Sequence, residues 1–280
     1  MKKNLFYVCS FILLVWACTK VPITGRKQLL MVGDSEMNAM AFASYQQFLD
    51  TSKVVPINTS QTQMVKRVGE KIALAAQSYF ESINQPNYLE AYKWQTELVQ
   101  SKDVNAWCMP GGKMVVYTGI LPITQTEEGL AVVMGHEVSH AIAKHGAERM
   151  SEGLLAQGLI QAGQIGLGIA MQNKPQQTQA LYNSMYGLLV PGTVQVARVL
   201  PHGRTQESEA DHLGLIFMSI AGYNPQAAIP FWQRMAEKAG GQKPPEFLST
   251  HPSDETRIRQ ITNWMPEALT YYQNRKPLSK

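Results

Sequence analysis

Two histidines one helical turn apart, with a glutamate beside the first, are the residues whose types and spacing best suit chemistry. His136, Glu137 and His140 form the pattern H-E-x-x-H. Residues four apart on a helix project from the same face, so both imidazoles can bind one metal ion. Glu137 lies beside that pair and can hold a water molecule on the metal. The pattern predicts a zinc hydrolase with one Zn²⁺ per chain, provided that a third ligand exists.

The same helix does not supply that ligand. One known extension of the pattern has a third histidine six residues after the second, but Gly146 stands there. His145 is one position away and points off the ligand face of a continuous helix, which indicates a structural or supporting role. Glu148 and Glu152 lie too far along the helix to turn back. Another element must therefore provide the third ligand.

Residues 206–211, with the sequence QESEAD, offer better candidates. Glu207 and Asp211 are four apart and share a helix face, whereas Glu209 points away from it. Glu207 can bind the metal, and Asp211 can accept the spare N–H of a histidine ligand and fix its tautomer. The alternative is a solvated acidic helix start, which the helix dipole favours. Beside H-E-x-x-H, the ligand role of Glu207 is the preferred interpretation.

Several helices must position these residues, and hydrophobic periodicity predicts where they are. Helices are expected from Asp34 or Ser35, over about 59–79, over about 205–220, from Pro225 to about Ala239, and after a cap at Ser253. Residues 18–33 lack a helical period and should form an extended arm. Residues 34–280 are expected to form one domain, which suits a chain of 280 residues of which 45% are hydrophobic.

A small sheet is expected before the motif helix. Residues 92–99 predict a strand, and residues 105–119 predict a hairpin with its turn at 110–112. Thr124 with Glu127 three residues later fits a capping box for the motif helix. The sheet and the helix together would form one side of a cleft.

The segment after the motif helix, which is expected to end near Met150, has mixed signals. Residues 153–171 are apolar but carry five glycines and three glutamines. Insertion into a membrane is one interpretation, whereas the spaced glutamines favour a close-packed buried helix or a mobile flap. Residues 172–203 contain several prolines and predict an irregular connection. Residues 153–203 as a whole are therefore a variable segment that could act as a lid.

The N-terminus resembles a secretory signal peptide of the lipoprotein type over residues 1–17. Lys2 and Lys3 precede an apolar run that is too short to span a bilayer. Residues 15–18 resemble a lipobox and predict a lipid on Cys18, with an ordinary cleaved signal as the alternative. Such a lipid would anchor the chain to a membrane.

Cysteine content and net charge argue against a disulfide-stabilised fold and against a nucleic-acid-binding protein. Beyond the leader and Cys18, Cys108 is alone, so no internal disulfide is expected. The net charge is +4, and Lys2 and Lys3 supply two of these charges. No basic stripe interleaved with aromatic residues is present, so nucleic acid is not an expected partner.

Taken together, His136-Glu137-x-x-His140 and Glu207-x-x-x-Asp211 resemble peptidase family 48 of the metallo class, the HtpX- and BepA-like gluzincins. The resemblance extends to residues 21–29, 105–119, 207–214 and 221–225. It implies an α+β, mostly α, zincin-type domain with a small antiparallel or mixed sheet. It also implies zinc on His136, His140 and Glu207, and an edge strand near 113–118 that binds peptide by strand addition.

Two further residues follow from this resemblance. His251 lies in a His-Pro pair that can approach the zinc in similar proteins, either as a latch in the open coordination position or as a group that stabilises the oxyanion. A loop histidine before a capped helix is the alternative. Arg204 matches an arginine that pairs with carboxylates near the site.

The predicted function is a zinc-dependent endopeptidase of the bacterial cell envelope, facing the periplasm and anchored to the outer membrane through Cys18, because Thr19 follows that cysteine. Its expected partners are misfolded or stalled outer-membrane and periplasmic polypeptides. Glu137 would act as general base and then as general acid, with Asp211 and His251 assisting. A chaperone or assembly factor with a latched or structural zinc is the competing class. A membrane-embedded protease would require residues 153–171 to insert.

Overall fold

The computed structural model describes residues 18–172, 176, 200–239, 247, 251 and 255–278. The chain divides into two compact units, a larger one of residues 33–145 and 207–280 and a smaller one of residues 1–32 and 146–206. The signal peptide predicted over 1–17, the cap at Ser253 and most of the irregular connection predicted over 172–203 lie outside the described residues.

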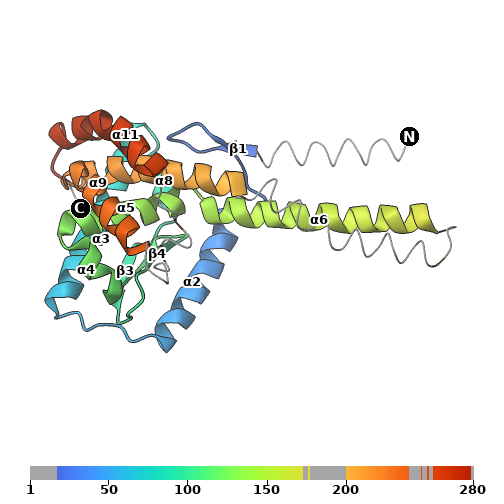
Figure 1. The fold of residues 1–280 in the computed structure, drawn as a ribbon, viewed down its shortest axis with the longest axis horizontal. Helices are drawn as coiled ribbons and strands as arrows, with labels where there is room; N and C mark the ends of the chain where they lie inside the picture. The colour runs from blue at the N-terminus through green and yellow to red at the C-terminus, as the bar shows by residue number, and fades with distance from the viewer. Residues whose placement is uncertain are drawn as a thin grey trace. The chain divides into compact units, whose positions relative to one another are not determined.

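The larger unit contains a three-stranded mixed sheet in the order β3-β5-β4 (Figure 1). Its strands are β3 (Gln95–Val99), β4 (Ala106–Met109) and β5 (Lys113–Tyr117). β5 is parallel to β3 and antiparallel to β4. The predicted strand and hairpin are thus confirmed, and Gly111 and Gly112 form the turn with φ of 77° and 82°, a backbone conformation that glycine adopts readily.

The expectation of an edge strand at 113–118 is wrong, because β5 is the central strand of this sheet. A hairpin strand becomes an edge only if nothing pairs with its outer side, and β3 pairs there in register from Gln95 with Lys113 to Val99 with Tyr117. The strand beside the motif helix is β4, which has no partner on its outer side among the residues placed here.

Helices cover both faces of the sheet. On one face α2 (Asp34–Thr51) packs Tyr45 against Val99 and Val115. On the other face lie α3 (Ser60–Ser82) and α5 (Glu127–Ile142). Alternate strand residues are therefore buried on opposite sides, as the two-residue period of a strand requires.

The motif helix α5 begins and ends at places other than those predicted. Its cap is Thr126, whose hydroxyl accepts the Gly129 N–H at 3.1 Å, because the short helix α4 (Leu121–Thr124) already contains Thr124. The helix ends at Ile142 rather than near Met150, since Lys144 has a left-handed backbone with φ of 58°. From Gly129 to Ile142 every residue is buried, so the helix lies inside the larger unit beyond its first turn.

A second long helix, α8 (Leu200–Ile220), crosses α5 at a pair of glycines. A Cβ atom on Gly214 would lie 2.8 Å from the backbone nitrogen of His136, and one on Gly135 would lie 2.8 Å from the carbonyl oxygen of Gly214. The two backbones are thus in direct contact. This close crossing brings the side chains of Asp211 and Glu207 to those of α5.

The larger unit is completed by the 3-10 turn η4 (Pro225–Ala227) and the helices α9 (Ala228–Ala239) and α11 (Glu255–Gln273). They confirm the helices predicted after Pro225 and near the C-terminus. α9 buries Phe231, Trp232 and Met235, and these side chains form part of the hydrophobic core.

In the smaller unit, the predicted extended arm folds into an antiparallel hairpin of β1 (Cys18–Lys20) and β2 (Lys27–Leu29). Arg26 at its end binds the carboxylate of Glu148 through two contacts of 2.7 and 2.8 Å, and this carboxylate belongs to α6 (His145–Met171).

The interpretation of residues 153–171 as a buried helix is wrong in one respect. The segment is helical, as part of α6, but Leu159, Ile165 and Ile169 are 54%, 66% and 69% exposed. Among the described residues no helix combines the length and the hydropathy that a membrane crossing requires. The lid role of 153–203 stays a prediction.

Candidate metal centre

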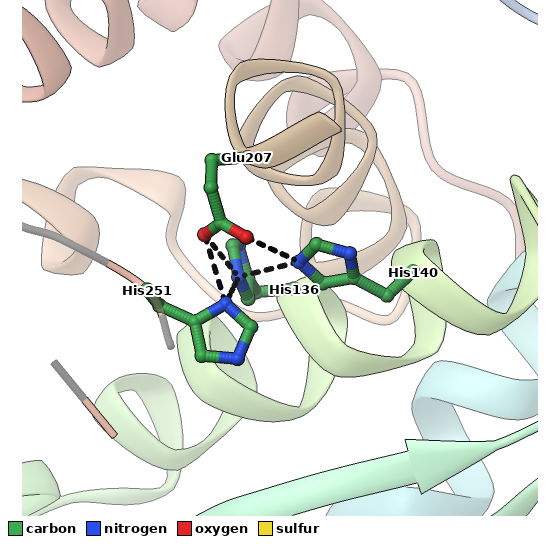
Figure 2. Close-up of side chains that lie close together, drawn as sticks. All are labelled: His136, His140, Glu207 and His251. Carbon is green, nitrogen blue, oxygen red and sulfur yellow. Dashed lines mark hydrogen bonds and ion pairs between the residues drawn. The ribbon is translucent and has the colours of Figure 1, made fainter. Parts of the chain in front are cut away.

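Four side chains from three segments of the larger unit meet at one point (Figure 2). They are His136 and His140 from α5, Glu207 from α8, and His251, and their ligand atoms all lie within 4.8 Å of one another. His136 Nε2 is 3.0 Å from His140 Nε2 and 3.1 Å from His251 Nδ1. The Glu207 carboxylate lies 3.4 Å from His136 Nε2, 3.3 Å from His140 Nε2 and 2.8 Å from His251 Nδ1.

These separations fit a tetrahedral zinc ion. Bonds of about 2.0–2.1 Å place the ligand atoms of such an ion about 3.3 Å apart. Three imidazole nitrogens that face one another would not be a satisfactory hydrogen-bonded cluster, because each neutral ring has only one N–H and one lone pair. Three nitrogens and a carboxylate that converge are instead the ligand types zinc prefers.

Asp211 contacts the ring of His136 on the side away from the cluster. Its Oδ1 lies 2.8 Å from His136 Nδ1, so it accepts the ring N–H and leaves Nε2 free for a metal. Burial alone would raise the pKa of Asp211, but the Arg257 guanidinium and His136 hold that pKa below its usual range. The carboxylate therefore stays charged.

The pKa values of the two motif histidines decide whether each ring is free to bind a metal. Burial keeps the pKa of His140 well below its ordinary value, so this ring is neutral and able to bind a metal. Burial alone would also lower the pKa of His136, but the carboxylates of Asp211 and Glu207 raise it to about 9. Metal binding must then displace a proton from His136.

Glu137 lies beside the ligands with one oxygen available. Its side chain is 7% exposed, and Oε1 has no hydrogen-bond partner among the residues that could be placed. Burial raises the pKa of this carboxyl above its ordinary value, which suits a group that must accept a proton. The ring of His251 lies beside it, with Nε2 3.4 Å from Glu137 Oε1.

His251 is held in place from its backbone. Its N–H donates to the Phe247 carbonyl at 2.9 Å, and the Phe247 N–H donates to the carbonyl of Val104 at 3.0 Å. The ring thereby reaches Glu207 on one side and Glu137 on the other. Within the larger unit, the structure thus brings together the predicted residues Glu137, Asp211 and His251 with His136, His140 and Glu207. Cys18 opens β1 in the smaller unit.

The sequence reasoning missed Arg257. This guanidinium donates to Asp211 Oδ1 at 2.8 Å and stacks on Trp232, with its central carbon 3.5 Å from the ring centroid. Arg204, which was expected to pair with the site carboxylates, is exposed instead. No local signal separates Arg257 from Arg259, since only the fold shows which of them points inward.

Glu209 was expected only to point away from the face that carries Glu207 and Asp211. Its side chain is 4% exposed, and its Oε2 lies 2.9 Å from His145 Nε2. This buried contact was not predicted, because no pattern in the sequence relates the two residues.

A mostly helical domain with an H-E-x-x-H helix and a carboxylate donor on a later helix defines a metallopeptidase of the zincin type, which confirms the predicted fold class. The chain belongs to Peptidase family M48, whose sequence model matches residues 59–265.

Known relatives are similar over most of the chain. It is 32% identical over 252 residues to mitochondrial metalloendopeptidase OMA1 of Schizosaccharomyces pombe, covering 89% of this chain and 66% of that protein. It is 29% identical over 253 residues to metalloendopeptidase OMA1, mitochondrial, of Homo sapiens, covering 89% and 46%. It is 30% identical over 167 residues to the beta-barrel assembly-enhancing protease of Escherichia coli, covering 59% and 33%. The chain thus spans between a third and two thirds of the length of these relatives.

These comparisons contradict the predicted location on a bacterial outer membrane. The OMA1 relatives that match 89% of the chain are named mitochondrial, whereas the bacterial relative matches 59% of it. The prediction depended on residues 15–18 and on Thr19. So short a pattern carries less information than a match over 252 residues.

Proposed function

We propose that the chain is a zinc-dependent endopeptidase in which His136, His140 and Glu207 hold the ion and Glu137 is the general base. One observation carries the proposal: three ligand atoms converge beside a buried carboxylate whose Oε1 has no hydrogen-bond partner in the described part of the chain. When bound, zinc supplies a Lewis acid for the scissile carbonyl and activates water.

The side chains around the ion would then transfer the proton and hold the ligands in place. Glu137, with its raised pKa, accepts a proton at its unpaired oxygen and returns it to the leaving amine. Asp211 fixes the tautomer of His136. Arg257 holds Asp211 in turn, and because its guanidinium is stacked on Trp232, that carboxylate has little freedom to move.

The edge strand β4 supports an extended polypeptide as the substrate. β4 packs against α5, and burial raises the pKa of the Cys108 thiol, with Glu137 near enough to raise it further. A peptide added antiparallel to β4 would therefore run past the catalytic glutamate. Misfolded or stalled polypeptides present such segments. The name of the Escherichia coli relative supports unfolded β-barrel chains among them.

The direct test is metal removal. The chain from residue 18 onward, loaded with zinc, is expected to cleave a fluorescently labelled, permanently unfolded polypeptide. Stripping with a chelator should abolish cleavage, and one equivalent of Zn²⁺ should restore it, because the proposed mechanism depends on the metal to polarise the carbonyl and to activate water. Cleavage that survives complete zinc removal, checked by elemental analysis, would exclude this function.

We further propose that His251 is a latch in the fourth coordination position. Its Nδ1 is 3.1 Å from His136 Nε2 and 2.8 Å from Glu207, about the spacing expected of a fourth ligand. His251→Ala should then raise the turnover of the unfolded substrate severalfold. His212→Ala is the matched control, since His212 pairs with Glu267 outside the site. A fall in turnover would instead assign His251 to the oxyanion, and no hydrolysis by any variant would favour a chaperone.

The lipid on Cys18 stays a prediction, because residues 1–17 lie outside the described part. Expressed in bacteria, the full chain is expected to incorporate an alkyne-labelled fatty acid, and Cys18→Ser should lose the label entirely. Cys108→Ser is the control, since Cys108 lies in strand β4, far along the sequence from residues 15–18, and should not be acylated. Equal labelling of Cys18→Ser would refute the anchor.

A further inference from the structure

A second buried chain of hydrogen bonds lies behind the metal site, on the side of His140. His145 Nδ1 is 2.8 Å from His140 Nδ1, and His145 Nε2 is 2.9 Å from Glu209 Oε2. The side chains of His145 and Glu209 are 0% and 4% exposed. Neither residue is needed as a ligand or as the catalytic base.

A break in the helix brings His145 to this place. On a continuous helix a residue five positions after His140 would be rotated by about 140° from it and could not face it. Here α5 ends at Ile142, Lys144 takes a left-handed backbone, and His145 begins α6. The chain therefore turns, and the two rings meet with centroids 4.8 Å apart.

The break is supported by specific contacts. The hydroxyl of Tyr88 donates to the Ile142 carbonyl at 3.0 Å, and that of Tyr92 donates to the Ala141 carbonyl at 2.9 Å. These carbonyls lie in the last turn of α5, and that of Ala141 also accepts the Lys144 N–H at 3.2 Å. Lys144 in turn pairs with Asp34 at 2.6 Å. Because the carbonyls at this helix end have hydrogen-bond donors and Lys144 has an ion-pair partner, the end of α5 is a fixed part of the fold and not a frayed terminus.

The position of each proton in the chain follows from its neighbours. His140 Nε2 faces His136 and Glu207, so it offers its lone pair to the metal and carries its proton on Nδ1. His145 Nδ1 must then accept that proton's hydrogen bond. The proton of His145 is thereby placed on Nε2, where it is donated to the Glu209 carboxylate.

We propose that His145 and Glu209 are positioning residues, which fix the tautomer and orientation of the ligand His140 through this two-step relay. The proposal rests on the proposed zinc site and deepens it. His136 receives its support directly from a carboxylate, whereas His140 receives it through an intervening ring. The two ligands are thus held by different means, and loss of the relay leaves Asp211 and His136 intact.

The first test measures the proton positions without any substrate. In zinc-loaded chain labelled with ¹⁵N-histidine, long-range ¹H–¹⁵N spectra should show His140 protonated on Nδ1 and His145 protonated on Nε2. Of the six histidines, the one whose signals are missing from the spectrum of His145→Phe is His145, and the signals of its neighbour His140 should shift most. A proton on His145 Nδ1, or on both of its nitrogens, would overturn the relay.

The second test measures zinc affinity by competition with a chelator. His145→Phe and Glu209→Leu should weaken zinc binding about 10- to 100-fold, the range found when supporting partners of ligands are removed. Glu209→Gln retains an oxygen acceptor and should recover most of the loss. Glu267→Leu is the control, because it removes the carboxylate partner of His212, a histidine outside the site. Its zinc affinity should stay within about twofold of that of the parent.

The outcomes separate this proposal from its alternatives. If the variants unfold more easily but bind zinc as tightly as the parent, the residues are only structural and the relay is refuted. If His145→Phe does not fold, the comparison of Glu209→Gln with Glu209→Leu decides. A parent that binds zinc and shows the expected tautomers, yet cleaves no polypeptide, would count against the proposed function and leave the relay standing.

Discussion

Glu137→Gln is expected to abolish hydrolysis of an unfolded polypeptide while the protein still binds one zinc ion. Glutamine has almost the shape of glutamate, but its amide cannot take up a proton at the unpaired Oε1 position. General acid–base catalysis contributes about 10²–10⁴-fold to a rate, so kcat should fall by at least about 10²-fold. The measurements are kcat on the labelled substrate and the zinc content of the purified variant.

The control for this variant lies on the same helix. Glu128 is in the first turn of α5, partly exposed, and is not one of the residues assembled around the metal centre. Glu128→Gln should therefore leave kcat and zinc content unchanged. Cleavage by Glu137→Gln at more than a tenth of the parent rate would exclude Glu137 as the base. Loss of zinc from that variant would show that its carboxylate supports the metal.

Gly214→Ala is expected to destabilise the protein and to weaken zinc binding together. The new Cβ would lie 2.8 Å from the backbone nitrogen of His136, which no side-chain rotation can relieve. Overpacking of this kind costs about 1–3 kcal/mol, more than the gain of up to about 1 kcal/mol when alanine replaces a helix glycine. Because α5 must shift, its ligands shift relative to Glu207. Urea unfolding and chelator competition measure the two effects.

Gly153→Ala provides the comparison for that prediction. Gly153 lies in α6, and a Cβ atom there would meet nothing within 4 Å. This variant should be as stable as the parent or more stable by up to about 1 kcal/mol. If Gly214→Ala proved as stable as Gly153→Ala and bound zinc normally, close contact of α5 and α8 would not be what holds the ligands together.

The side chains that converge as the sequence analysis expected owe this to spacing within one helix. His136 and His140 share a face of α5, and Glu207 and Asp211 share a face of α8, because four residues make about one turn whatever surrounds the helix. The expectation for His251 came from the family resemblance, and its ring lies with those of His136 and His140. Which residues share a helix face is set by the local sequence alone.

The parts that were missed depend on where helices break and which segments meet. His145 was expected in a structural or supporting role but not beside His140, because the helix was taken as continuous and Lys144 breaks it. The contact of Glu209 with His145 was not predicted for the same reason. Arg257 reaches Asp211 from 46 residues away. The edge strand was misplaced because β3 pairs in parallel with β5, an association that no hairpin pattern can indicate.

The shortness of β4 has a consequence for which proteins could be cut. The strand has four residues, and in an edge strand only every second residue turns its N–H and C=O outward. A substrate would then be gripped through the backbone of about two residues, with little demand on its sequence. It must, however, be locally extended. In a folded protein that state requires an opening reaction, and one that costs about 4 kcal/mol would slow cleavage roughly 1,000-fold. An enzyme built in this way would select its substrates by their conformational stability.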